Sequence, residues 1–293
     1  MSDLAELGFS TDQRVAVVHA DDIGMSHAAN MGAFAALAHG PATCGSVMVP
    51  CPWFGEAAAI ARAEPGFDLG VHLTLNAEFD RYRWGPVANT TDVSTLVGAD
   101  GTLFADPSDT VRHAEADQVA TELRAQIQRA LDAGIDVTHI DSHMGTLFHA
   151  KFFDVYLALA REFRVPAFLP TSADNPPDDG PTLDPINEIG ADGWPLFDGF
   201  CADSLSFSPG DGLTHNQNRI AALKPGLNYL ICHPAQRGGE LDAITDSAHC
   251  RDFERTFYGG PVGYEHLWTE AIETIGMRPL RDLLHQRLAA KES

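Results

Sequence analysis

The first half of the chain alternates between short apolar runs and longer stretches with helical spacing. Apolar runs at 14–20, 43–50 and 67–75 are typical of buried strands, and the stretches at about 26–39 and 54–64 repeat apolar residues with helical spacing. Further helices are predicted at 115–134, 150–163, 261–276 and 279–288, and further strands at 135–141, 165–170 and 227–234. This alternation predicts a parallel α/β fold, and a TIM-like (β/α) barrel suits it better than an open sheet.

Two polar stretches break the alternation and are expected to form long loops at the carboxyl ends of strands. Gly, Asp and Thr are frequent at about 76–112, and Pro, Asp and Gly crowd the beginning of a second stretch at about 171–227. The sequence has no internal repeat and no change of composition typical of a linker. We therefore expect residues 1–293 to form a single domain with two loop-rich insertions.

Composition limits the partners and the compartment. With 19 Lys and Arg against 41 Asp and Glu, the formal charge is −22, and such a chain should repel nucleic acid and anionic membranes. No apolar stretch approaches the length of a membrane span, the first residues do not resemble a signal segment, and the five cysteines form no CxxC pair. We expect a cytoplasmic protein that acts on a small molecule, without nucleic-acid or membrane partners. A homodimer is left open, because the sequence identifies no interface.

Acids and imidazoles collect where four of the predicted strands end. Sites in parallel α/β folds assemble at the carboxyl ends of strands, so these side chains are expected to meet. In the segment THIDSH, the alternate residues His139, Asp141 and His143 share one face of the strand if the strand continues to the end of the segment. The residues concerned are Asp21, Asp22, His72, His139, Asp141, His143 and His233.

Each member also has a structural explanation. A single Asp after a strand is usually a turn residue or a helix N-cap, His72 suits a hydrogen-bonded core histidine, and His233 suits a loop. His139 and Asp141 suit a structural pair. His19 directly precedes the acidic pair, yet strand alternation can turn it away from the site. The remaining histidines are expected to be surface or packing residues: His27, His39, His113, His149, His215, His249, His266 and His285.

The adjacent acids Asp21 and Asp22 need a counter-charge. They repel each other, and burial raises the cost of keeping both ionised. One carboxylate and two imidazoles from different strands can bind a divalent metal and leave positions open for water and substrate. A cation held by Asp22 would keep Asp21 ionised and available as a base toward water. These donors favour zinc, cobalt or iron.

Four segments resemble motifs of the YdjC-like carbohydrate deacetylases, which include chitooligosaccharide deacetylases. HADDIGMS is similar to the family's N-A-D-D-F-G-x-S, GVHLTLN to G-x-H-x-x-L, THIDSH to T-H-L-D-S-H, and CHPA to C-H-P-A/G, in the same order. The resemblance implies a distorted (β/α) barrel that removes N-acetyl groups from amino sugars with a divalent metal, generally magnesium. It assigns Asp22, His72 and His143 to the metal and Asp21 to the base, and it matches His233 to the family's C-terminal histidine.

The chain departs from these motifs at several positions. His19 replaces the usual Asn, and Ile23 replaces Phe. The family's D-S-H-x-H-x-H continues here as DSHMGTL, with Gly145 and Leu147 in place of the later histidines and His149 out of register. The metal histidine is therefore kept, whereas neighbouring contacts to the sugar or the leaving group are lost.

Together these inferences predict the hydrolysis of an acetamide on a sugar, with one Zn²⁺ or Mg²⁺ ion and Co²⁺ as an alternative. The metal would polarise the carbonyl and a water molecule, Asp21 would take the water's proton, and His233 would protonate the amine or orient the acetyl group. Asp141, beside His139, would hold a ligand imidazole from behind. Loop aromatics are candidates to stack on the sugar ring, although packing roles are commoner for such residues: Trp53, Trp84, Trp194 and Phe197.

Two other functions fit the same residues. A phosphoesterase or a cyclic amidase on the same barrel would be favoured by a bridging ligand and a second metal. A non-catalytic sugar-binding or metal-binding relative is suggested by the loss of the later histidines. Retention of Asp21, which has no obvious use except as a base, argues for activity.

Overall fold

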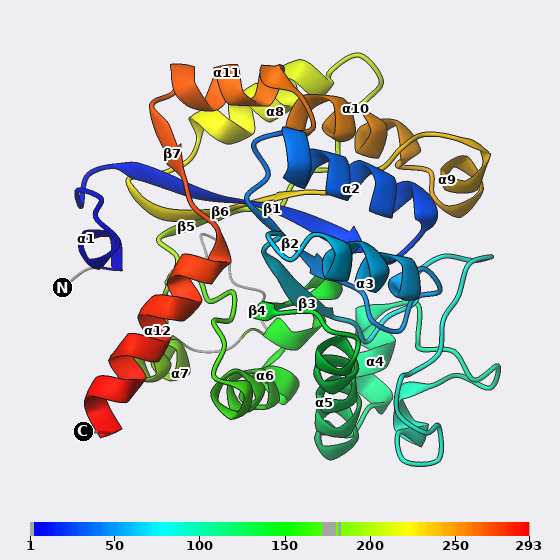
Figure 1. The fold of residues 1–293 in the computed structure, drawn as a ribbon. Helices are drawn as coiled ribbons and strands as arrows, with labels where there is room; N and C mark the ends of the chain where they lie inside the picture. Colours follow the sequence, from blue (N-terminus) through cyan, green and yellow to red (C-terminus); the bar gives the residue numbers. More distant parts are fainter. Residues whose placement is uncertain (1–2, 172–179, 181–182, 293) are drawn as a thin grey trace.

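The structure, a computed structural model, describes residues 3–171, 180 and 183–292. A curled parallel sheet lies at its centre, with helices on the outer side (Figure 1). The strands are β1 (Arg14–Ile23), β2 (Cys44–Val47), β3 (Leu69–Leu73), β4 (Val137–Ser142), β5 (Gly199–Cys201), β6 (Gly226–Cys232) and β7 (Ile272–Thr274).

The helices form two groups, above and below the sheet in Figure 1. Those above and beside it are α2 (His27–His39), α3 (Phe54–Ala63), α8 (Gly212–Ala221), α9 (Gly239–Ile244), α10 (Ala248–Tyr258) and α11 (Pro261–Thr269). Those below it are α4 (Pro107–His113), α5 (Ala116–Asp132), α6 (Ala150–Phe163), α7 (Leu183–Ala191) and α12 (Met277–Glu292). The short helix α1 (Asp3–Glu6) precedes β1, and the 3-10 turns η1 (Ser94–Leu96) and η2 (His143–Phe148) lie in the connections.

Single backbone bridges close the sheet into a distorted barrel. The strand order is β4-β3-β2-β1-β6-β5, all pairs are parallel, and β7 pairs with the first residues of β1. Between β4 and β5, the segment 165–170 forms isolated bridges to Ile140 of β4 and to Phe197 just before β5. The predicted strand at 165–170 is thus present only as these bridges. The prediction of a distorted (β/α) barrel is confirmed.

The two faces of β1 belong to two different apolar clusters. Ala16 and Val18 lie in the large cluster that the sheet shares with its helices. Val15 and Val17 lie in a smaller cluster with Tyr229 of β6, on the face that alternation turns to the inside of the barrel. Because both faces are covered, β1 is an almost continuous apolar run, as expected of a parallel strand buried on both sides.

The chain turns sharply after β1, which fixes the end of the strand. Gly24 has a φ of +90°, a left-handed conformation that a glycine adopts without steric cost. Ser26 is the N-cap of α2, and its hydroxyl accepts a hydrogen bond from the amide of Ala29 at 3.1 Å. The acidic pair near the end of β1 is therefore held between a strand and a capped helix.

The predicted helix at 261–276 is wrong in its second half. Helix α11 ends at Thr269, Ala271 takes a left-handed φ of +51°, and residues 272–274 form β7 beside β1. Three residues are too few to show strand periodicity, so the pairing with β1 decides their conformation.

The stretches expected to be loops contain regular elements. Helix α4 lies at the end of the first, and α7, β5 and α8 lie in the second, where residues 172–179 and 181–182 are outside the described part. Helices α9 and α10 were not predicted either. Short amphipathic helices between Gly and Pro residues have weak periodicity, and tertiary packing stabilises them.

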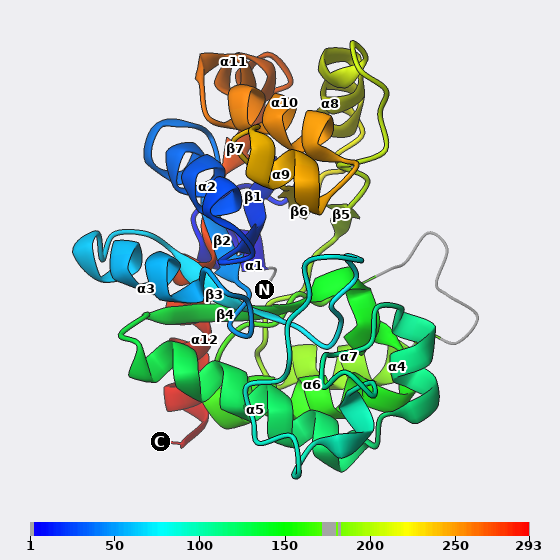
Figure 2. The same cartoon turned by 90° about the vertical axis from the view of Figure 1, so that its right-hand side faces the viewer.

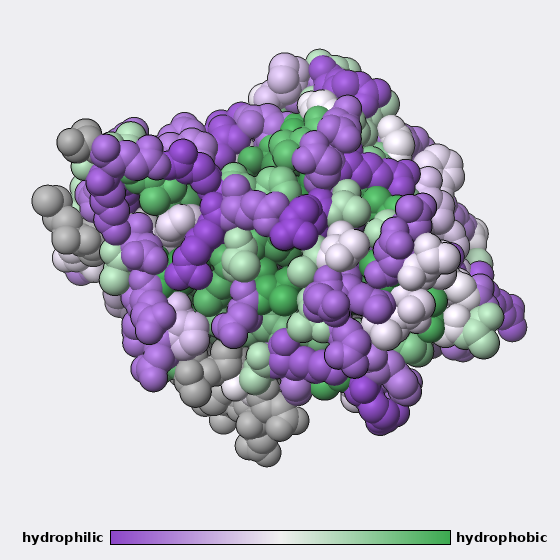
Figure 3. All heavy atoms as spheres, turned by 90° about the horizontal axis from the view of Figure 1, so that it is seen from below, coloured by the Kyte–Doolittle hydropathy of each residue, from purple (hydrophilic) through white to green (hydrophobic). Residues whose placement is uncertain are grey.

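None of the helices in the described ranges is both long enough and apolar enough to cross a membrane. Figure 3 shows the molecule from below, a face that carries mainly hydrophilic side chains with apolar ones in scattered patches between them.

Candidate active site

The acids and imidazoles that the sequence singles out meet at the carboxyl end of the barrel, the end that faces the viewer in Figure 2. Asp21 and Asp22 lie near the end of β1, His72 lies on β3, His143 follows β4, and His233 follows β6. All of these side chains are buried or nearly so. The curled sheet thus brings four strand ends to one place.

An irregularity in β1 lets adjacent acids face the same site. Successive side chains of a regular strand point to opposite faces, which would separate Asp21 from Asp22. Asp22 instead has a left-handed φ of +63°, and the register between β1 and β2 shifts between Ala20 and Ile23. Left-handed backbone is uncommon outside glycine, though Asp tolerates it, and it concentrates at functional sites. The bend breaks the alternation and turns both carboxylates toward His72.

Asp22, His72 and His143 present three ligand atoms to one point. Asp22 Oδ1 lies 3.6 Å from His72 Nε2 and 3.4 Å from His143 Nδ1. Among the buried side-chain N and O atoms of the described residues, Asp22 Oδ1 is one of two without a hydrogen-bond partner. An unpartnered buried carboxylate oxygen is costly, and a cation bound between these atoms would remove that cost.

Each ligand is held from behind by a charged residue. Asp141 Oδ1 lies 2.9 Å from His72 Nδ1, and Glu78 Oε2 lies 3.0 Å from His143 Nε2. These contacts place a proton on the rear nitrogen of each ring and leave the front nitrogen free to bind a metal. Arg251 donates to Asp22 Oδ2 at 2.7 Å.

Sequence reasoning missed Glu78 and Arg251. Glu78 comes two residues after the GVHLTLN segment, and this proximity was the only available signal. Arg251 comes from α10, and nothing in the sequence connects it with the acidic pair.

The buried carboxylates around Asp22, His72 and His143 favour positive charge at this point. Burial opposes ionisation of Asp22, but Arg251 and the neighbouring imidazoles outweigh it and hold the pKa of Asp22 well below its usual value. Burial also opposes protonation of His143, yet Glu78 and Asp22 raise its pKa to about 10. The pKa of His72 is raised as well, because Asp141 and Asp21 outweigh burial. The buried carboxylates thus favour positive charge at these imidazoles, the charge that a divalent ion would bring.

Asp21 begins a buried chain of polar contacts through His19. Asp21 Oδ1 lies 2.6 Å from His19 Nδ1, and His19 Nε2 lies 2.7 Å from His139 Nε2. His139 Nδ1 is in turn 2.9 Å from the hydroxyl of Thr138, which donates to Asp68. His19 thus shares the face of Asp21, two residues away along the strand, and is not turned away from the site. This chain fixes one oxygen of Asp21.

His233 is positioned by a second buried chain. Its Nδ1 lies 2.8 Å from the hydroxyl of Ser204, which donates to Glu254 Oε2 at 3.0 Å. Burial lowers the pKa of His233 to about 4, against the attraction of Asp22 and Asp21. Burial also raises the pKa of Glu254 to about 7, against the attraction of Arg219. His233 is therefore neutral at pH 7, and its unprotonated Nε2 faces Asp21 Oδ2 at 3.8 Å.

The four loop aromatics do not gather around the acids. Trp84 is buried beside the site, its ring centre 6.5 Å from that of His143, and its Nε1 donates to the carbonyl of Asn76. Trp53 is partly exposed and packs against His27. Phe197 is buried in the inner apolar cluster.

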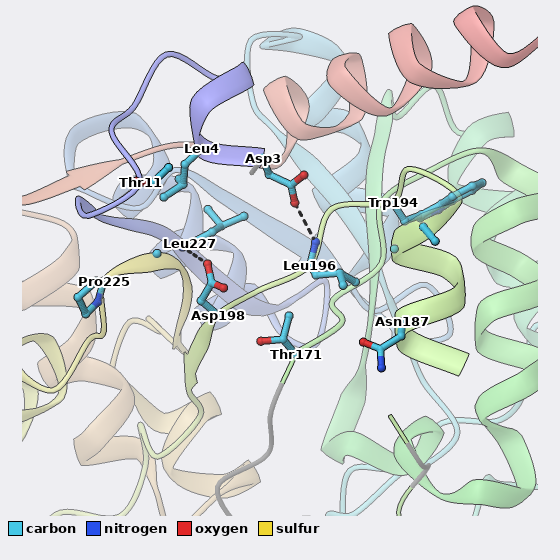
Figure 4. A pocket seen from close by; sticks show the side chains of 13 residues that line it. Asp3, Leu4, Thr11, Thr171, Asn187, Trp194, Leu196, Asp198, Pro225 and Leu227 are labelled. Atoms are coloured by element: carbon cyan, nitrogen blue, oxygen red, sulfur yellow. Dashed lines mark hydrogen bonds between the residues drawn. The ribbon is translucent and has the colours of Figure 1, made fainter. Parts of the chain in front are cut away.

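Trp194 lies in a different part of the molecule. It lines a separate cavity of about 430 Å³ near the amino ends of β5 and β6, together with Asn187 and Leu196 (Figure 4). The structure does not bring Trp194 to the acids at the other end of the barrel.

The remaining eight histidines are exposed or half-buried, as the sequence predicted. The positions that depart from the family's histidine pattern have two different surroundings. Gly145 lies in the left-handed turn after His143, and Leu147 is buried in the large apolar cluster.

The chain is similar in sequence to known proteins. The sequence model of the YdjC-like protein family matches residues 15–261. A carbohydrate deacetylase of Thermus thermophilus is 32% identical over 235 residues, which cover 80% of this chain and 82% of the relative. A carbohydrate deacetylase of Thermoanaerobacter pseudethanolicus is 26% identical and covers 82% of this chain and 88% of its own length.

A solved structure has the same fold. It is the crystal structure of an Enterococcus faecalis V583 protein named for cellobiose-phosphate cleavage, which superimposes with a TM-score of 0.75 over 92% of this chain and 99% of that chain, at 23% identity. The chain therefore belongs to the YdjC-like family of carbohydrate deacetylases, as its motifs predicted.

Proposed function

We propose that the protein hydrolyses the N-acetyl group of an amino sugar and that Asp22, His72 and His143 hold one divalent metal ion for this reaction. The observation that carries the proposal is the convergence of Asp22 Oδ1, which lacks a hydrogen bond, with His72 Nε2 and His143 Nδ1. A base, Asp21, has its Oδ2 at 3.8 Å from one of these atoms, His72 Nε2. The named relatives support an activity on amides of carbohydrates.

The donor atoms favour zinc over magnesium. Two imidazole nitrogens and one carboxylate oxygen suit Zn²⁺ or Co²⁺, whereas Mg²⁺ prefers oxygen ligands. The nearby oxygens of Asp141 and Glu78 are occupied by the rear nitrogens of the two imidazoles. When bound, the metal supplies a Lewis acid that polarises the amide carbonyl and stabilises negative charge on its oxygen.

Asp21 acts as the general base. His19 holds Oδ1, so Oδ2 is the oxygen that faces His72 Nε2 and His233 Nε2, each at 3.8 Å. Asp21 Oδ2 accepts a proton from the attacking water as the water oxygen bonds to the carbonyl carbon. The fixed orientation of the carboxylate raises the fraction of encounters with correct geometry.

His233 moves the proton to the leaving amine. It is neutral at rest with an unprotonated Nε2, so it takes over from Asp21 Oδ2 the proton that the water lost and donates it to the amine nitrogen as the C–N bond breaks. Ser204 and Glu254, aligned behind Nδ1, stabilise the imidazolium that forms in between.

A two-metal hydrolase is less well supported. Two other groups of potential ligands occur in the described part of the chain, and both include His19. One adds Asp21 and Asp141, and the other adds Cys44 and His139. Both nitrogens of His19 contact other members of these groups directly. A second ion would have to break these contacts.

The test is acetate release from N-acetylated sugars by metal-stripped protein that is re-supplied with Zn²⁺, Co²⁺ or Mg²⁺ separately. We expect release with Zn²⁺ or Co²⁺ from the wild type and none from His143→Ala. His113→Ala changes a histidine on the surface of α4 and is the matched control. Tight metal binding without acetate from any sugar would contradict the proposed reaction and leave a non-catalytic binding protein.

A further inference from the structure

Two spaces with different linings border the acids and imidazoles of the site. One is a polar groove of about 560 Å³ between the segment after β3 and the helix α9, with Glu78, Arg81, Asp242 and Ser247 in its lining. The other is a cavity of about 320 Å³ in the mouth of the barrel, whose wall is mainly apolar. The site therefore lies between a polar space and an apolar one.

The apolar cavity opens on the reacting centre, whereas the polar groove lies behind the proposed metal ligands. Glu78 of the polar groove contacts His143, and Ser247 accepts a hydrogen bond from Arg251, which holds Asp22. On the other side, Asp21 and His233 themselves form part of the cavity wall. A substrate whose reacting carbon lies at Asp21 can thus extend one substituent into the apolar cavity.

The apolar cavity is built by side chains from several elements. Phe168 comes from the bridging segment, Phe200 from β5, Ile231 from β6, and Phe148 and Met144 from η2. Phe200 and Met144 are 42% and 46% exposed, which is unusual for large apolar side chains and places them at the rim. Contiguous exposed apolar surface at a cleft is typical of a binding site for an apolar group.

Apart from the reacting atoms of Asp21 and His233, the polar side-chain atoms of this cavity already have hydrogen-bond partners. Tyr229 donates its hydroxyl to Asp141 Oδ2, which also accepts from Ser46. The hydroxyl of Ser142 accepts from the amide of Leu147. A sugar ring has hydroxyl groups on both sides of its amine, and burying them against this wall would leave them without partners. An aliphatic group loses nothing there.

We propose that the cavity receives the acyl group of the amide, that the preferred acyl group is an aliphatic chain longer than acetyl, and that the sugar stays outside the cavity. This inference rests on the proposed function, since it concerns the substrate of the same hydrolysis. The water oxygen bonds to the carbonyl carbon, the C–N bond breaks, and the products are a carboxylate and a protonated amine. Water is the only co-reactant.

The experiment measures kcat/KM for N-acetyl-, N-propionyl-, N-butyryl- and N-hexanoylglucosamine with the Zn²⁺-loaded enzyme. We expect kcat/KM to rise about fourfold for each methylene until the cavity is filled, because each buried methylene contributes about that factor. Phe200→Ala should flatten this slope. Leu213→Ala, which removes a similarly exposed apolar side chain from α8, is the matched control and should keep it.

The outcomes separate this inference from the proposed function. Release of acetate together with falling kcat/KM for longer acyl chains would overturn the inference and leave the deacetylase intact. A second series keeps the N-acetyl group and lengthens an alkyl group on the glycosidic oxygen. If kcat/KM rises with this alkyl length and not with acyl length, the inference is also overturned, because the cavity would then hold the other end of the substrate. No carboxylate from any member of the series would contradict the proposed function.

A calorimetric measurement tests the cavity without turnover. Asp21→Asn, titrated with N-acetyl- and N-hexanoylglucosamine, should bind the hexanoyl compound more tightly by at least tenfold. Equal affinities would overturn the inference whatever the activity assay gives.

Discussion

The two halves of the inner face of β1 use the same strand geometry for opposite purposes. In the first half, Val15 and Val17 pack against apolar side chains inside the barrel. In the second half, His19 and Asp21 occupy the same face at the same spacing, but each is held by specific polar contacts. Apolar packing needs only volume and shape, whereas each buried polar group needs a partner with the right geometry. The polar half therefore depends on the chemical identity of its distant partners, whereas the apolar half depends on the volume and shape of the side chains that surround it.

Removing the base should give the largest effect and should appear in catalysis alone. Asp21→Asn keeps the shape of the side chain but cannot accept the proton, so we expect kcat to fall about 10²- to 10⁴-fold. Metal stoichiometry should stay at one equivalent. Asp154→Asn, at an exposed position on α6, is the control in the same acetate-release assay. Activity within threefold of the wild type in Asp21→Asn would show that another group is the base.

Metal affinity should rise steeply with pH. In the metal-free protein the pKa of His143 is raised to about 10, so its imidazole is protonated between pH 6 and 8, and Zn²⁺ must displace at least one proton from it. With one proton released, the apparent affinity for Zn²⁺ should increase about tenfold per pH unit, and therefore about a hundredfold between pH 6 and pH 8. Calorimetry in buffers of different ionisation enthalpy measures the released proton directly. An affinity independent of pH would mean that His143 does not bind the metal through its ring.

A cut in the apolar half should affect stability instead. Val17→Ala removes two buried methyl groups from the inner cluster, and we expect the free energy of unfolding to fall by about 2 kcal/mol. Denaturant unfolding measures this loss, while kcat/KM should stay within about twofold of the wild type. A large loss of activity without a loss of stability would erase the difference between the two halves.

Breaking the contact between Asp21 and the rest of the polar chain should give the smallest effect. His19→Ala frees Oδ1 of Asp21 and should lower kcat about tenfold with little change in KM or metal content. His19→Asn places an amide that can donate to Asp21, and it should recover part of the loss. Equal kcat in both variants would indicate that His19 fills space and does not orient the base.

The sequence was most informative where chemistry and strand position coincide. The barrel, the acidic pair and the imidazoles of β3 and β4 follow from apolar runs that end in polar residues. The shared site of Asp21 and Asp22 could be expected only from their charge, since the left-handed backbone of Asp22 that produces it leaves no periodic signal.

Apart from Asp141, the residues that hold the site from behind were beyond the reach of the sequence. Arg251 and Glu254 lie on α10, a helix that was not predicted, and Ser204 lies in a stretch expected to be loop. Their roles depend on packing between segments that lie between 21 and 229 positions apart in the chain. The strands β5 and β7 have three residues each, too few for a periodic pattern, and only their pairing with β6 and β1 reveals them.

A titration of metal-free protein with Co²⁺, followed by visible absorption, tests the central claim most directly. The account predicts that one equivalent of Co²⁺ binds and gives the intense visible absorption of a low-symmetry site with nitrogen and oxygen ligands. This absorption should be lost in His143→Ala and in Asp22→Asn and retained in His113→Ala. Full binding with an unchanged spectrum in His143→Ala and Asp22→Asn would contradict the assignment of these residues to the metal.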